Sequence, residues 1–260
     1  LDFRSASFRR KRLSETFVYR PYDTRNECIL RVTRIAEKDR RPICHSRSDS
    51  LSILVVLVMF IEQPPFFYRM LFPETIWRIP GDKKTVYLTF DDGPIPQVTP
   101  WVLDVLDYYE VKATFFCVGD NVARNPNLFQ VIRDRGHQVG NHTMNHVKGM
   151  SMSPEKYVRN VMNAHDLIQS RLFRPPHGHM LPGQAKLLKK DFSIIMWDVV
   201  TRDYSNKLSG EQVFGNVKRY ARNGSIIVFH DSIKAERNLH YALPRTINWL
   251  RENGFLFKTL

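Results

Sequence analysis

The chain has 260 residues, of which 43% are hydrophobic, and this is enough for one large α/β domain or for one domain with a tail. Its formal net charge of +13 is unevenly spread, because residues 1–58 hold 13 Lys/Arg against 7 Asp/Glu and the remainder holds 26 against 19. The remainder has neither a basic run with interleaved aromatic residues nor a nucleic-acid-binding motif, so we expect no nucleic-acid partner.

The first 58 residues differ from the rest of the chain. Residues 1–50 contain eleven Arg and two Lys and show no sustained periodicity. The largely apolar run 51–61 is too short to span a bilayer as a helix, which takes about 20 residues. We therefore predict that residues 1–58 are a non-domain extension ahead of a natural start at Met59. Residues 59–83 are then a lead-in segment, and residues 84–260 form the folded domain.

Two expectations for location follow from this segment. A chain that starts at Met59 would be cytoplasmic, whereas a chain in which residues 51–61 act as a signal or anchor would be exported or membrane-anchored. The basic stretch before the run is longer than a usual signal-peptide n-region, and no small-x-small cleavage site follows the run. Membrane association is therefore possible but not expected.

From Lys84 onward, short apolar runs alternate with helical patterns. β-Branched and aromatic residues predict strands at 85–90, 113–118, 138–140, 172–173, 194–197, 225–229 and 255–258. Capping residues and prolines predict helices that begin near residues 99, 125, 153, 184, 209 and 243. This alternation predicts a parallel sheet covered by helices.

The three cysteines suggest neither a metal site nor disulfide bonds. Cys28, Cys44 and Cys117 are far apart and have no CxxC spacing, which argues against a thiolate metal site and against a disulfide framework. Cys117 lies in the second predicted strand, where we interpret it as a small buried hydrophobe.

Chemically useful side chains gather where the predicted strands end. In α/β barrels the carboxyl ends of the strands carry the active site. Six polar residues fall at or just past such ends: Asp91, Asp92, His142, Arg174, Asp198 and His230.

The strand ends that carry Asp91 and Asp92, and His142, suggest a metal site. A bend at Gly93-Pro94 could bring the carboxylates of Asp91 and Asp92 into one cleft, although the same residues could form a surface turn. His142 and His146 are four residues apart and could aim both imidazoles at one point. Two imidazoles and one carboxylate are a common catalytic zinc set, but an isolated HxxxH can also be two surface or capping histidines.

Two further residues have a functional and a structural interpretation. His230 follows four apolar residues, so it could be a general acid in a dry site or a structural histidine bonded to Asp231. Arg174 lies in a proline-stiffened loop and could pair with a carboxylate. We treat the other histidines as non-ligands, with His177 and His179 as candidates for lining the cleft.

Taken together and in this order, these segments resemble the polysaccharide deacetylases, the NodB-homology domain of carbohydrate esterase family four, over about residues 65–260. Residues 89–94 match the motif Thr-Phe-Asp-Asp-Gly-Pro, residues 142–146 match His-Ser/Thr-x-x-His, and residues 174–178 match Arg-x-Pro-x-Gly. Residues 228–230 correspond to Leu-x-His with Val in place of Leu. The resemblance implies a distorted (β/α) barrel with fewer than eight strands.

The resemblance also implies a metal site and its chemistry. Asp92, His142 and His146 would bind a divalent metal, most simply Zn²⁺, with Co²⁺, Ni²⁺ or Mn²⁺ as options. Asp91 would be the catalytic base, Arg174 would orient it, and His230 would be the catalytic acid.

The fourth motif departs from the family pattern. It often reads Asp-x-x-Asp-Trp, whereas this chain has Val200 and Tyr204 at the first and last positions. Asp203 matches the second aspartate and is implied to support Arg174 or the acid. A backbone N–H near Tyr204 is a candidate donor to the oxyanion.

The function implied by the resemblance is a metal-dependent hydrolase that removes N-linked acetyl groups from a carbohydrate. The expected partner is an acetylated glycan such as peptidoglycan, a chitin-like oligomer or a surface glycan. The alternatives are an O-acetyl esterase acting on xylan-type polysaccharide and a non-catalytic glycan-binding module of the same fold. No oligomeric state is predicted.

Overall fold

A computed structural model describes residues 62–260, which belong to one compact unit. Its strands are β1 (Thr75–Ile76), β2 (Thr85–Asp91), β3 (Thr114–Cys117), β4 (Gln138–Asn141), β5 (Leu172–Phe173), β6 (Ser193–Ile195), β7 (Val199–Val200), β8 (Ser225–His230) and β9 (Leu256–Phe257). Its α-helices are α2 (Phe66–Met70), α3 (Thr99–Tyr108), α4 (Gly119–Arg124), α5 (Pro126–Asp134), α6 (Pro154–Ile168), α7 (Pro182–Leu188), α8 (Gly210–Tyr220) and α9 (Glu236–Glu252). Two 3₁₀ turns span Gly149–Ser151 and Pro176–Gly178. Within residues 62–260, no helix has the length and apolar character needed to cross a membrane.

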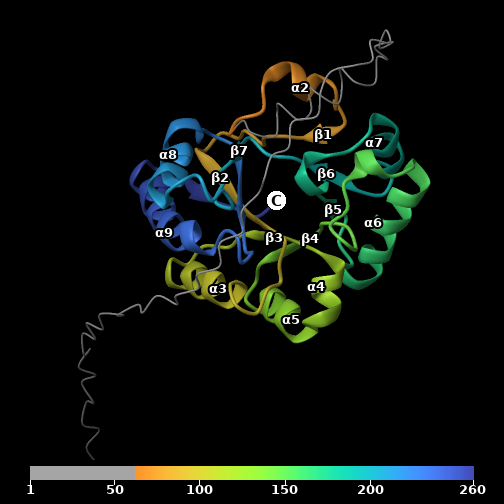
Figure 1. Cartoon of the computed structure of the whole chain (residues 1–260). Helices are drawn as coiled ribbons and strands as arrows, with labels where there is room; N and C mark the ends of the chain where they lie inside the picture. The colour runs from red at the N-terminus through yellow and green to blue at the C-terminus, as the bar shows by residue number, and fades with distance from the viewer. Residues whose placement is uncertain (1–61) are drawn as a thin grey trace, which may run out of the picture. The chain divides into compact units, whose positions relative to one another are not determined.

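The strands form one curled sheet whose named pairs are all parallel, in the order β1-β6-β5-β4-β3-β2-β8-β7, with β9 paired to β2. In Figure 1 the strands surround the centre and the helices from α3 to α9 form an outer ring. The expected class, a distorted (β/α) barrel, is confirmed. The strand count differs from the expected "fewer than eight", because the sheet has nine strands. The two that were not predicted, β1 and β7, are two-residue strands that leave little pattern in the sequence.

The longest strand pairing in the sheet is that of β2 with β8, which runs in register from Val86 opposite Ser225 to Asp91 opposite His230. All seven residues of β2 are buried. A strand that is buried on both faces needs a continuous apolar run, and this explains why both segments were easily recognised as strands. Because the two strands end side by side, the polar residues that follow them share one edge of the sheet.

Most predicted helices are confirmed, including the capping box of α8. There the Gln212 N–H donates to Ser209 Oγ at 3.2 Å, and the Ser209 N–H donates to Gln212 Oε1 at 2.9 Å. The predicted start of the last helix at residue 243 is wrong, because α9 begins at Glu236 and carries Pro244 in its interior. Buried residues ahead of the proline, Leu239 among them, pack into the core and extend the helix across it.

The segment before Lys84 also belongs to this unit. It supplies β1, which pairs with β6, and the short helix α2. The Val200 N–H donates to the Glu62 carbonyl at 2.8 Å, and Arg202 forms an ion pair with Glu62 at 2.7 Å. The predicted extension 1–58, the start at Met59 and the apolar run 51–61 lie outside the described residues.

Candidate active site

A pocket of about 240 Å³ opens at the carboxyl edge of the sheet. Its lining comes from the ends of β2 and β8, from the loops after β4 and β5, and from the segment around β7: Asp91, Asp92, His142, His146, His177, Trp197, Val200, Tyr204, Val228, His230, Ser232 and Lys234. Five of the seven predicted site residues therefore line one pocket. The other two, Arg174 and Asp203, are fully buried behind it and contact lining residues.

Asp91 and Asp92 enter the same pocket because the chain turns at the end of β2. Asp91 is the last residue of the strand, and Asp92 has a positive φ of 85°, a left-handed conformation that few non-glycine residues adopt. In a continued strand, the side chains of Asp91 and Asp92 would lie on opposite faces of the sheet. Because the chain turns at Asp92, both side chains line the pocket instead. Backbone strain of this kind concentrates at functional sites.

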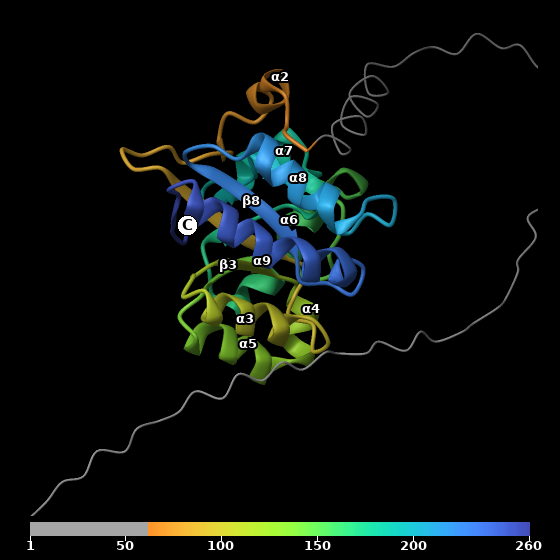
Figure 2. The ribbon, with the colours of Figure 1, turned by 90° about the vertical axis from the view of Figure 1, so that its left-hand side faces the viewer.

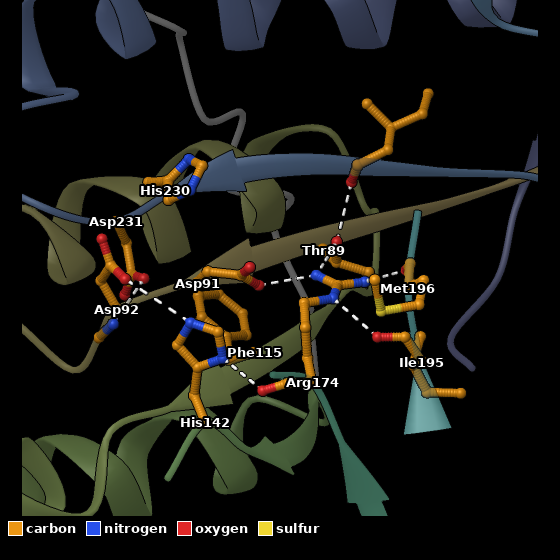
Figure 3. Close-up of polar contacts among 12 residues, drawn as sticks. Thr89, Asp91, Asp92, Phe115, His142, Arg174, Ile195, Met196, His230 and Asp231 are labelled. Carbon is orange, nitrogen blue, oxygen red and sulfur yellow. Dashed lines mark hydrogen bonds and ion pairs between the residues drawn. The ribbon is translucent and has the colours of Figure 1, made fainter. Parts of the chain in front are cut away.

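Arg174 holds Asp91 from behind, as Figure 3 shows. Its Nη1 lies 2.7 Å from Asp91 Oδ1 and also donates to Thr89 Oγ1 at 2.8 Å, while its other nitrogens donate to the carbonyls of Ile195 and Met196. The guanidinium is fully buried, and every one of these contacts fixes its plane. The predicted pairing of Arg174 with a carboxylate is thus present, with Asp91 as the partner.

Asp92, His142 and His146 form a cluster with metal-ligand chemistry. One ligand atom from each lies within 4.8 Å of the other two. Asp92 Oδ1 lies 3.2 Å from His146 Nε2 and 3.8 Å from His142 Nε2. Ligands of a tetrahedral ion with bonds of about 2.0–2.1 Å are separated by roughly 3.3 Å, so this donor set fits a Zn²⁺-sized cation.

The tautomer and charge of His142 suit a ligand. Its Nδ1 lies 2.8 Å from the Arg174 carbonyl, which can only accept, so Nδ1 carries the proton and Nε2 presents a lone pair to Asp92. Burial lowers the pKa of His142 to about 4, which keeps the ring neutral near pH 7. Burial opposes ionisation of Asp92, but the hydrogen bond from His146 and the fields of His230 and His142 hold the pKa of Asp92 below its usual range.

The HxxxH segment is a loop rather than a helical turn. It follows β4, and both Thr143 and His146 have positive φ values, of 65° and 53°. The Thr143 N–H donates to Asn141 Oδ1 at 2.8 Å and the Met144 N–H donates to Asn160 Oδ1 at 2.9 Å, so side-chain amides hold the loop in place. The two imidazoles nevertheless converge, with ring centroids 5.1 Å apart.

His230 is paired with Asp203. Its Nδ1 lies 2.8 Å from Asp203 Oδ1, and its backbone N–H donates to Asp203 Oδ2 at 2.7 Å. Burial alone would lower the pKa of His230, but the charge and hydrogen bond of Asp203, helped by Asp92 and Asp91, raise it to about 9. Of the two implied roles of Asp203, the geometry therefore favours support of the acid over contact with Arg174.

The alternative in which Asp231 bonds the His230 ring does not match the contacts. Asp231 instead accepts from the Gly93 N–H at 3.0 Å and from the Thr99 hydroxyl at 2.6 Å. Burial raises the pKa of Asp231 to about 8, with a further rise from Asp92. A side chain at Gly93 would overlap this carboxyl group, so Asp231 and Gly93 together shape the turn after β2.

Similarity to known proteins identifies the family. A family model described as "Polysaccharide deacetylase" matches residues 78–191. A peptidoglycan-N-acetylglucosamine deacetylase of Bacillus cereus is 33% identical over 192 residues, which are 71% of this chain and 90% of that protein. The chain belongs to the polysaccharide deacetylase family.

Two further relatives agree with this assignment. A chitooligosaccharide deacetylase of a Bradyrhizobium species is 36% identical over 156 residues, covering 57% of this chain and 71% of that protein. The crystal structure of the Bc1960 peptidoglycan N-acetylglucosamine deacetylase, bound to an N-hydroxybenzamide, has a TM-score of 0.70 at 31% identity and covers 75% of this chain and 94% of that one.

Some positions of this deacetylase differ from what its sequence suggested. Asp198 immediately precedes β7 rather than following the carboxyl end of a strand, and its carboxylate accepts from Arg222, Arg69 and Ser225 outside the pocket. The chain passes from β6 to β7 at this point, and in the strand order β6 is second from one end while β7 is at the other end. Asp198 therefore lies in a connection between strands. In this structure the Asp198 carboxylate holds the side chains of Arg69 and Arg222.

One of the two histidines that were expected to line the cleft does so. His177 lines the pocket, with its ring edge-on to His146, whereas His179 is not among the lining residues. The Tyr204 N–H donates to Asp203 Oδ1 at 3.1 Å, so that amide is already engaged and is a weaker oxyanion donor than we expected.

Three lining residues were missed from the sequence: Trp197, Ser232 and Lys234. Trp197 follows β6, and the other two follow β8 by two and four residues. His230 was identified because polar residues at strand ends are candidates for the site. Considering the next four residues after each strand as well would have found all three.

Proposed function

We propose that this chain is a metal-dependent hydrolase that removes the N-acetyl group from N-acetylglucosamine residues of a glycan. The observation that carries the proposal is the arrangement of one pocket. A three-residue ligand set, an arginine-held carboxylate and an aspartate-held histidine all face the same space. Amide hydrolysis needs these three functions, namely an electrophilic activator, a base and an acid.

Asp92, His142 and His146 are the proposed metal ligands, and Zn²⁺ is the proposed ion. The two-imidazole, one-carboxylate set is typical of catalytic zinc sites that leave coordination positions open. A bound divalent ion would supply Lewis acidity, lowering the pKa of a water and polarising the acetyl carbonyl. The hydrogen bond from His142 Nδ1 to the Arg174 carbonyl orients one ligand, as a hydrogen bond from the other ring nitrogen does in many histidine metal sites.

Asp91 is the proposed base. Arg174 binds its Oδ1, and among residues 62–260 no hydrogen bond or ion pair to Oδ2 is described, so that oxygen can accept a proton from the attacking water. The buried guanidinium holds the carboxylate in a fixed orientation. A base in a fixed orientation needs no reorganisation when the water attacks.

His230 is the proposed acid, and it favours an amide over an ester substrate. Its pKa of about 9 leaves the imidazole protonated near neutral pH, with Nδ1 bound to Asp203 and Nε2 left to donate. A departing sugar amine must receive a proton, whereas a departing alkoxide depends on one less strongly. This favours N-deacetylation over the xylan-type O-acetyl esterase.

The proposed substrate is peptidoglycan, with chitin-like oligomers as the second choice. The apolar part of the lining, formed by Trp197, Val200, Tyr204 and Val228, can surround an acetyl methyl group and one face of a sugar ring. The functions printed for the relatives, on peptidoglycan N-acetylglucosamine and on chitooligosaccharide, support both choices.

Acetate release from matched substrates tests the proposal. Purified full-length protein would be loaded with Zn²⁺ and given peptidoglycan glycan strands, N-acetylglucosamine pentamer and acetylated xylan, each with and without chelator. We expect chelator-sensitive release from the first two. Release from xylan alone would establish the esterase instead, and metal binding without release from any substrate would favour a non-catalytic glycan-binding module.

A further inference from the structure

Among the described residues that line the pocket, Lys234 is the one lysine or arginine. Its side chain is exposed, and within residues 62–260 it takes part in no described ion pair or hydrogen bond. A lysine ammonium carries a positive charge and three hydrogen-bond donors, so this side chain is available to bind an anion. Neither the proposed metal site nor the proposed proton transfers use this cation.

The backbone that carries Lys234 is fixed at the pocket wall. Lys234 lies in the short connection from β8 to α9, two elements that are drawn in blue in Figure 2. Both ends of this connection are anchored, because Asp231 and Ala235 are fully buried. The Asp231 N–H donates to the Asp91 carbonyl at 3.1 Å, and the Ala235 N–H donates to the Ser232 carbonyl at 2.9 Å. The long side chain of Lys234 is therefore the part that can adjust to a ligand.

The carboxylates of the pocket already have other partners. Asp91 binds Arg174 at 2.7 Å, and Asp92 belongs to the cluster with two histidines. Among residues 62–260, neither carboxylate forms a described ion pair with Lys234. A protonated His230 and a bound divalent ion would add positive charge to the same space, and a cleft lined by one sign of charge attracts ligands of the opposite sign. An anionic partner for Lys234 must therefore come with the ligand.

A second lysine, Lys148, lies near the pocket on the loop after β4, two residues beyond His146. It is exposed, and its side chain has no described partner within residues 62–260. Burial, with smaller contributions from three neighbouring histidines and from Lys148, lowers the pKa of His177 to about 3. Because a charge acts in this way at short range, the Lys148 ammonium lies near the His177 ring, which lines the pocket. Strands β3 and β2 separate β4 from β8 in the sheet, so Lys148 and Lys234 reach the pocket from different sides.

We propose that Lys234 and Lys148 bind carboxylate groups of the glycan, so that the enzyme prefers N-acetylglucosamine residues that lie next to carboxylates. This proposal rests on the N-deacetylase function proposed above and narrows its substrate class from acetylated glycans to anionic ones. Lysine suits the task, because a compact ammonium on a flexible stem can follow carboxylates at different positions. Peptidoglycan presents such groups on the lactyl side chains of muramic acid once its peptides are removed, or on the peptides themselves, whereas chitin-like oligomers have none.

Acetate release from matched glycans tests the proposal. The full chain, loaded with Zn²⁺, is given peptidoglycan strands without peptides, and the same strands after their carboxyl groups have been converted to methylamides. The two substrates differ in charge and present the same acetyl groups. The measured quantity is the charge preference, defined as kcat/KM for the carboxylate strands divided by kcat/KM for the methylamide strands. We expect wild type to have a charge preference above one that shrinks as salt is added.

Four variants separate the role of the lysines from a general effect of surface charge. Lys234→Met and Lys148→Met should each lower the charge preference by roughly twofold to fivefold, mainly through KM, which is the range of a partly exposed ion pair. The double variant should lower it by about the product of the two single effects. Lys234→Arg should retain the charge preference. The control is Lys83→Met, at an exposed position two residues before β2 and thus at the opposite end of that strand, and it should leave the charge preference unchanged.

Strands that still carry their peptides identify the source of the carboxylate. A loss of kcat/KM in Lys234→Met that is confined to these strands would assign the carboxylate to the peptide, and a loss confined to the peptide-free strands would assign it to the lactyl group. Either result supports the proposal. A wild-type charge preference of one on both kinds of strand, or a double variant with the wild-type charge preference, would overturn it.

A binding measurement keeps this proposal distinct from the proposed function. If no strand releases acetate, the N-deacetylase function fails, and calorimetry with the same carboxylate and methylamide strands then decides the role of the lysines. Weaker binding of the carboxylate strands by the double variant, with methylamide strands affected much less, would support carboxylate binding by Lys234 and Lys148. Equal binding of the carboxylate strands by wild type and the double variant would refute it.

Discussion

The pair His230–Asp203 offers the sharpest test of the proposed acid. Asp203→Asn keeps the size of the side chain and removes its charge. The carboxylate is fully buried and contacts both the ring and the backbone of His230, at 2.8 and 2.7 Å. A change in the titration of His230 therefore reports the loss of the carboxylate, that is, of its charge and of one of its two acceptor oxygens.

The size of the effect follows from the pair. The pKa of His230 is raised from 6.5 to about 9 against the opposing effect of burial, and Asp203 is the first of the groups that raise it. A hydrogen bond to a charged partner contributes about 1.5–3 kcal/mol, and one pKa unit corresponds to about 1.4 kcal/mol. We expect the variant to lower the pKa of His230 by roughly 1–2 units. Metal on Asp92 affects wild type and variant alike, so the difference isolates Asp203.

The assay is the pH dependence of kcat/KM for acetate release by Zn²⁺-saturated protein. If protonated His230 is the acid, its pKa sets the alkaline limb, and Asp203→Asn should move that limb down by roughly 1–2 units. Activities near pH 6 should differ much less than those near pH 8.5. Asp166→Asn, at an exposed position on α6, is the control and should leave the profile unchanged. An unmoved alkaline limb in Asp203→Asn would refute the assignment.

The pH dependence of the free energy of unfolding is a second test of the pair His230–Asp203. Since folding raises the pKa of His230, the pair stabilises the fold fully below about pH 6.5, and this contribution is lost as pH rises through about 9. The difference in free energy of unfolding between wild type and Asp203→Asn should therefore be larger at pH 6 than at pH 10, by up to roughly 3 kcal/mol. Urea unfolding at the two pH values measures it, and a pH-independent difference would contradict the raised pKa.

Three further substitutions separate the remaining roles. Asp91→Asn should lower kcat by about 100-fold or more while Zn²⁺ affinity, measured by calorimetry, stays near wild type; loss of both would contradict its assignment as base. His146→Ala should abolish the rise in melting temperature that Zn²⁺ gives to wild type, and the assignment as ligand fails if that rise persists. Arg174→Met should cost about 3–5 kcal/mol in urea unfolding, because Asp91 is left buried without its partner, whereas a loss below about 1 kcal/mol would show that the pair is dispensable.

Local sequence predicted much of this site because its parts are local. Asp91 and Asp92 follow a strand whose seven residues are all buried, and such a strand is visible as an apolar run. His142 and His146 are close in the chain, so a single loop is enough to bring them together. The strand-end rule then placed both segments at one edge of a parallel sheet, which the pairing of β2 with β3 and of β3 with β4 confirms.

Other features could not be predicted because they depend on contacts between distant segments. Asp198 looks like one more strand-end residue, but the chain steps from β6 to β7 there, and the carboxylate binds Arg222 and Arg69 instead of facing the pocket. The last helix was predicted to begin at residue 243, whereas packing of the residues before Pro244 carries α9 back to Glu236.

The sequence by itself determined the family of the chain, the barrel class and the residue types of the site, because apolar runs, turn residues and short motifs are properties of neighbouring residues. Only the tertiary structure decided which charges meet, namely that Arg174 holds Asp91 and that Asp203 binds His230. These pairings join residues up to 83 positions apart, and burial sets their strength, so they exist only once the sheet has brought its strand ends together.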